Sequence, residues 1–142
     1  MCYSMTALDS YARTEVMTSS PAQLRTMLLQ RAVRESHQLV CDIERDNGEG
    51  ILQTGNRLRS LLLELMPAET STLDATLVSH LRSTGTYLYR TVADACGRRD
   101  RKAAGQIVKF LEFELDTWRQ VMARIDSDTT GSSSMAGTNL AG

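Results

Sequence analysis

Apolar residues recur every three or four positions along most of the chain, which is the spacing of one face of an α-helix. Four segments carry this pattern, and residues that typically begin or end helices separate them. The segments lie between Ser20 and Asp46, between Gly48 and Pro67, between Ser71 and Gly97, and between Asp100 and Asp126. No stretch shows a sustained period-two alternation, so the sequence predicts an all-α chain without strands.

Capping signals locate the starts of three of these helices. Ser20 is followed by Pro21 and, three residues after the serine, by Gln23. This combination is a capping box with proline at the first helical position. Ser71 and Asp100 are expected to cap the third and fourth helices, because serine and aspartate are favoured at that position.

The lengths of the segments predict how the chain is organised. Four helices of this length joined by short loops fold as an antiparallel four-helix bundle, which we expect over residues 20–126. Residues 1–19 precede the first cap and are expected to form an extended or short helical segment that packs on the bundle. Residues 127–142 are rich in glycine, serine and threonine, so we expect a flexible, disordered tail there.

Three of the helices carry more apolar residues than a narrow core stripe requires. The additional positions lie about 100° around the helix from the stripe. They are Leu29, Val33, Val40, Leu52, Leu63, Met66, Phe110, Phe113 and Val121. Three interpretations remain open: a wide buried face, a groove that binds an amphipathic segment of a partner, or self-association.

Composition excludes several classes of function. The 142-residue chain is 42% apolar and 23% charged, with a net charge of −1 and with acidic and basic residues interleaved. It lacks the clustered basic surface that nucleic-acid binding requires, and no apolar run reaches the ~18–20 residues that insertion across a bilayer requires. No secretory signal is visible. The three cysteines are odd in number and far apart, so we expect reduced thiols in a cytoplasmic protein.

The sequence offers no recognisable catalytic or metal-binding chemistry. A di-metal site in a helical bundle requires glutamate three residues before histidine. His37 and His80 instead follow Arg34 and Leu77 at that spacing. There is also no glycine-rich phosphate loop and no nucleophile elbow. We therefore expect no enzyme activity, no catalytic residues, no metal and no cofactor.

The most specific motif leads into the first helix. Its members keep a fixed spacing around the helix cap and are Tyr11, Val16, Thr18, Pro21, Leu24, Met27 and Leu28. The motif closely resembles the opening signature of the flagellar secretion chaperone family FliS. Tyr87 and Trp118 resemble aromatic residues of the family's third and last helices. The sequence departs from the family where Leu29 and Gly85 each stand in place of a tyrosine, and the similarity spans about residues 8–122.

The resemblance implies a cytoplasmic export chaperone that binds the C-terminal amphipathic segment of flagellin, prevents its premature polymerisation and delivers it to the flagellar export apparatus. It also implies that the N-terminal segment covers part of the binding groove when the groove is empty. For Tyr11 and Val16, a hydrophobic staple at the entry to the first helix is an equal alternative. The predicted partner-binding residues are Leu8, Tyr11, Val16, Leu29, Val33, Leu52, Leu63, Tyr87, Phe110 and Phe113. A helical adaptor or dimerisation module with an unrelated partner remains the alternative function.

Overall fold

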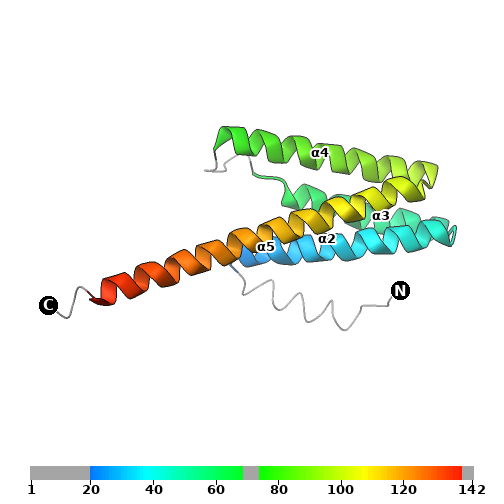
Figure 1. Ribbon diagram of the computed structural model, residues 1–142. Helices are drawn as coiled ribbons and strands as arrows, with labels where there is room; N and C mark the ends of the chain where they lie inside the picture. The colour runs from blue at the N-terminus through cyan, green and yellow to red at the C-terminus, as the bar shows by residue number, and fades with distance from the viewer. Residues whose placement is uncertain (1–19, 69–73, 139–142) are drawn as a thin grey trace.

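The computed structural model of the chain describes residues 20–68 and 74–138, with side chains as far as residue 131. Those residues form four helices and no strand, which confirms the predicted all-α fold (Figure 1). The helices are α2 (Pro21–Glu44), α3 (Gly48–Leu65), α4 (Ala75–Arg98) and α5 (Arg101–Thr138). No helix in the described ranges is long and apolar enough to cross a membrane.

The predicted capping box at the start of α2 is present. The Ser20 hydroxyl accepts a hydrogen bond from the Gln23 backbone N–H at 3.2 Å, and the Gln23 side-chain oxygen accepts one from the Ser20 N–H at 3.1 Å. At the start of α5, the Asp100 carboxylate accepts from the Ala103 N–H at 3.1 Å, so this predicted cap is also confirmed. Local side-chain chemistry therefore determines where both helices begin.

The predicted cap of α4 is wrong by three residues. Asp74 is the N-cap, and its carboxylate accepts a hydrogen bond from the Thr76 N–H at 2.9 Å. Ser71, the predicted cap, lies outside the described residues. Serine and aspartate are about equally favoured as N-caps, so the sequence alone could not choose between them.

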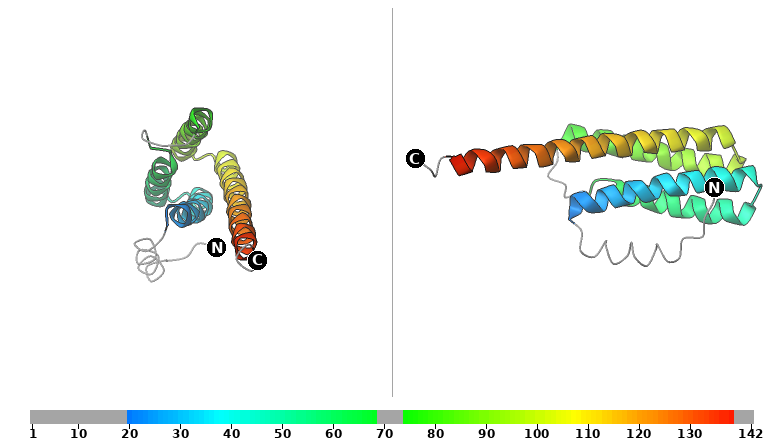
Figure 2. Two further views of the ribbon diagram at one scale, coloured as in Figure 1. Left: turned by 90° about the vertical axis from the view of Figure 1, so that its left-hand side faces the viewer. Right: turned by 60° about the horizontal axis from the view of Figure 1, so that its bottom comes forward.

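Successive helices run antiparallel and form a bundle in which α2 lies beside α3 and α5, while α4 completes the ring between α3 and α5 (Figures 1 and 2). The centre contains fully buried aliphatic residues from all four helices, including Leu39, Leu58, Val92, Ile107 and Leu111. Helices α4 and α5 pack least closely of the neighbouring pairs. Figure 1 shows them diverging toward the N-terminus of α4. The bundle is thus packed most loosely between these two helices.

A buried polar contact aligns α2 with α3. The Asp42 carboxylate accepts hydrogen bonds from the Thr54 hydroxyl at 2.8 Å and from the Gln38 amide at 3.0 Å. Nearer the surface, Arg57 pairs with Glu35 at 3.1 Å. A displacement of one helix along the other would leave the buried Asp42 carboxylate without its Thr54 donor, which is destabilising.

Helix α5 continues beyond the predicted boundary at Asp126. It is helical as far as Thr138, and its last turns project beyond the rest of the bundle (Figure 1). The Thr129 and Thr130 hydroxyls donate to the carbonyls of Ile125 and Asp126 four residues earlier, at 2.9 Å each. This stretch contains no proline. Its threonines are compatible with the helix because their hydroxyls bond the carbonyls of the preceding turn. Residues 139–142 lie outside the described ranges.

The expectation of three reduced thiols is wrong for one cysteine. Cys41 is disulfide-bonded, whereas Cys96 is a free thiol. Cys2 lies outside the described residues.

Candidate partner-binding groove

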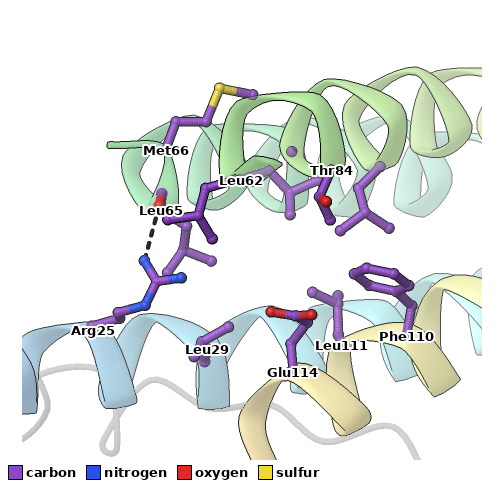
Figure 3. A pocket seen from close by; sticks show the side chains of 12 residues that line it. Arg25, Leu29, Leu62, Leu65, Met66, Thr84, Phe110, Leu111 and Glu114 are labelled. Carbon is purple, nitrogen blue, oxygen red and sulfur yellow. Dashed lines mark hydrogen bonds between the residues drawn. The ribbon is translucent and has the colours of Figure 1, made fainter. Parts of the chain in front are cut away.

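A pocket of about 410 Å³, which includes space open to solvent, lies where α4 diverges from α5 (Figure 3). Its inner surface consists of leucines that belong to the hydrophobic core, namely Leu29, Leu62, Leu88 and Leu111. Helix periodicity brings Leu88 and Leu111 to this place, because each belongs to the regular apolar stripe of its helix. The pocket therefore extends down to the core, where these four leucines are at most 4% exposed.

Met66 and Gly85 shape the pocket on the side of α3 and α4. The Met66 side chain lies across α4 at Gly85, where a Cβ atom would come within 3.0 Å of the Met66 terminal methyl carbon. Glycine at this position therefore admits the methionine. Methionine is unbranched and adapts its shape to its surroundings, so this side of the pocket is deformable.

Two large aromatic side chains extend the apolar surface outward from the pocket. Tyr87 lies one turn after the pocket residue Thr84 on α4, and Phe113 lies one turn after the pocket residue Phe110 on α5. Tyr87 is 63% exposed and Phe113 is 66% exposed, whereas Phe110 is partly buried against the core. We call the pocket together with Tyr87 and Phe113 the α4/α5 groove.

Charged and aromatic residues close one end of the pocket. The Arg25 guanidinium donates a hydrogen bond to the Leu65 carbonyl at 3.0 Å and lies over the Trp118 ring, 5.3 Å from its centroid. The Trp118 indole N–H donates to the Thr26 hydroxyl at 2.8 Å. Burial lowers the pKa of Arg25 from its ordinary value, and the negative charge of Glu114 partly opposes this effect. The end of the pocket thus combines an apolar wall with a half-buried positive charge.

The comparison with known families agrees with the motif at the start of the bundle. The family model described as flagellar protein FliS matches residues 4–125. The chain belongs to the FliS family. No curated protein matches the sequence. Membership gives this FliS-family protein the role of a flagellar export chaperone, and it confirms the resemblance that the segment from Tyr11 to Leu28 suggested.

The structure brings together only some of the predicted partner-binding residues. Leu29 forms the inner surface of the groove and is 3% exposed, and Val33 is partly buried against the core. For α2, the wide buried face is therefore the interpretation that the structure supports. Tyr87, Phe110 and Phe113 lie in or beside the groove.

The remaining predicted residues lie elsewhere. Leu52 is 61% exposed and Leu63 is 55% exposed on α3, about three turns apart, and neither lines the pocket. They lie on the same side of that helix, with the hydrogen-bonded pair Asn56 and Arg59 between them. Leu8, Tyr11 and Val16 lie outside the described residues, so the predicted cover over the groove stays a prediction.

No sequence pattern predicted Arg25 or Glu114 as groove residues. Each is a single charged residue in an amphipathic helix, and such residues usually lie on the solvated face. The only available signal was Trp118, because a half-buried indole typically attracts a cation to its face. Among the described residues, no three histidine, cysteine, aspartate or glutamate side chains come close enough to hold a metal ion.

Proposed function

We propose that this FliS-family protein binds the C-terminal amphipathic segment of newly made flagellin in the α4/α5 groove, and that it does so in the cytoplasm before export. The observation that carries the proposal is the exposure of Tyr87 and Phe113 beside a largely apolar pocket between the helices. Large aromatic side chains commonly provide most of the binding energy at protein interfaces.

The shape and chemistry of the groove suit a helical ligand. An amphipathic helix binds an apolar groove by placing residues at positions i, i+3, i+4 and i+7 against it. The α4/α5 groove offers aromatic edges from both helices, and Leu65 and Leu81, which line the pocket between the helices, are only half-buried. A flagellin segment that lies there has its apolar face covered. It therefore cannot pair with another flagellin, and the chaperone can present it to the export apparatus unpolymerised.

A second candidate function concerns two exposed leucines on α3. Leu52 and Leu63 are exposed on the same side of this helix and do not contribute to the groove. Each leucine is large and exposed, so each can contribute an apolar contact to an interface. A helical adaptor that contacts an unrelated partner, or a second copy of itself, through α3 is therefore the alternative.

Calorimetric titration distinguishes the two functions. The full chain is titrated with flagellin from the same organism, and with the same flagellin lacking its last ~40 residues, a segment about 60 Å long if helical. We expect binding by the complete flagellin and none by the truncated form. Equal binding of both forms excludes the C-terminal segment as the ligand. Binding of neither, together with self-association that Leu52→Glu abolishes, supports the alternative function.

A further inference from the structure

The pocket in the α4/α5 groove is apolar except for two opposite charges. Arg25 on α2 and Glu114 on α5 both line it, and Figure 3 shows the two side chains on different helices with their charged groups directed into the space between the helices. Within the described part of the chain they do not form an ion pair with each other, although the carboxylate attracts the guanidinium through space. Each charge therefore retains capacity for a ligand.

Arg25 has an obvious structural role, but this role uses only part of its guanidinium. One N–H group donates to the Leu65 carbonyl and so satisfies an acceptor at the C-terminus of α3, where a positive charge is also favourable. One face of the guanidinium lies over Trp118. A guanidinium carries further N–H donors in a planar fork that matches a carboxylate. These donors remain available at the edge of the pocket.

The environment of Arg25 favours an anionic ligand over a cationic one. The guanidinium is half-buried, and the loss of water around it lowers the pKa of Arg25, so the charged form lacks part of its usual stabilisation. A carboxylate placed against the free donors supplies this stabilisation. A ligand cation would be repelled by Arg25 and could contact only Glu114.

We propose that Arg25 binds one carboxylate side chain of the docked flagellin segment, and that Glu114 disfavours a carboxylate at any other place in the pocket. This inference rests on the proposed function of the groove. The apolar surface alone accepts an amphipathic helix at several positions along its length, because each turn presents similar residues. A single buried charge pair permits one position only, so Arg25 sets the register of the ligand.

The experiment uses a synthetic peptide of the last ~40 residues of flagellin from the same organism, about 60 Å long if helical. Each aspartate is replaced in turn by asparagine and each glutamate by glutamine, and each peptide is titrated against the unaltered full chain. We expect one replacement to weaken binding by about tenfold or more, because an amide cannot satisfy a desolvated guanidinium, and the others to have little effect. If no replacement weakens binding, the assignment is wrong, while binding by the parent peptide still supports the groove.

A double-mutant cycle then tests Arg25 itself. Arg25→Met should weaken binding of the parent peptide by about the same factor. It should also make the affinity insensitive to the one peptide replacement that weakens binding to the unaltered chain, because the partner of that carboxylate is gone. Arg25→Lys retains the charge and should retain part of the sensitivity. Arg34→Met is the matched control, since Arg34 is exposed on the same helix and does not line the pocket.

Independent, additive effects of Arg25→Met and the peptide replacement overturn the proposal. If Arg25→Met does not fold, the cycle with Arg25→Lys decides instead. Absence of binding by the parent peptide overturns the proposed function itself.

Discussion

The indole N–H of Trp118 donates a hydrogen bond to the hydroxyl of Thr26 at 2.8 Å and so joins α5 to the first turns of α2. Arg25, the neighbour of Thr26, lies over the same indole ring. This contact lies near the place where α5 leaves the bundle, and it closes one end of the α4/α5 groove. Trp118 therefore connects the stability of the bundle to the shape of the groove.

Replacing Trp118 tests this connection. Trp118→Ala should lower the free energy of unfolding by about 2–3 kcal/mol, below the full range for a completely buried tryptophan because this one is half-buried. Trp118→Phe keeps most of the packing and loses the hydrogen bond, for a loss of about 1 kcal/mol. Urea unfolding measures both values. Equal losses for the two variants would mean that packing against Arg25 and α2 contributes little.

Phe113 tests the outer edge of the groove. Phe113→Glu should leave the helical circular-dichroism spectrum and the cooperative melt unchanged, because the side chain is 66% exposed. It should weaken binding of the flagellin C-terminal peptide by about 2 kcal/mol or more, which is typical of an interface hot spot. Leu52→Glu is the matched control, because Leu52 is an apolar residue of similar exposure, 61%, outside the groove. Titration calorimetry on both variants gives the comparison, and an equal effect of the two would contradict the placement of the ligand between α4 and α5.

The capping box of α2 should affect stability and not binding. Ser20→Ala combined with Gln23→Ala removes both reciprocal hydrogen bonds and should lower the free energy of unfolding by about 1–2 kcal/mol. The affinity for the flagellin peptide per folded molecule should stay the same, because neither residue lines the groove. A urea melt indistinguishable from that of the parent protein would show that the box contributes nothing to the stability of α2.

Replacement of glycine by alanine should have opposite effects on stability at two positions, Gly55 and Gly105. A Cβ atom at Gly55 would lie 2.6 Å from the Cys96 sulfur, so Gly55→Ala should force α3 and α4 apart and destabilise the bundle by about 1–3 kcal/mol. Gly105 lies within α5 with no atom near the position of a Cβ. Gly105→Ala should stabilise the protein by about 0.5–1 kcal/mol, because alanine favours the helix. Thermal melts of both variants check the signs, and a stabilising Gly55→Ala would mean that the two helices do not approach this closely.

The helices, most of their ends and the family could be predicted from the sequence because their signals are local. The reciprocal hydrogen bonds of Ser20 and Gln23 join residues three apart, and the cap at Asp100 likewise acts within one turn. Such contacts form wherever the helix forms, whatever surrounds it. The cap of α4 could not be chosen from the sequence, because Ser71 and Asp74 are both suitable and stand close together. The end of α5 carried no strong stop signal.

The tertiary structure alone decided which apolar residues are core and which are groove. Leu29 and Leu52 are both leucines that lie off the regular stripe of their helices, yet Leu29 is 3% exposed and Leu52 is 61% exposed. Charged residues of one type also differ in burial: Arg25 is half-buried against Trp118, whereas Arg34 on the same helix is exposed. Periodicity describes the direction of a side chain relative to its own helix. Burial depends on how closely the neighbouring helices approach, and the divergence of α4 from α5 is a property of the assembled bundle.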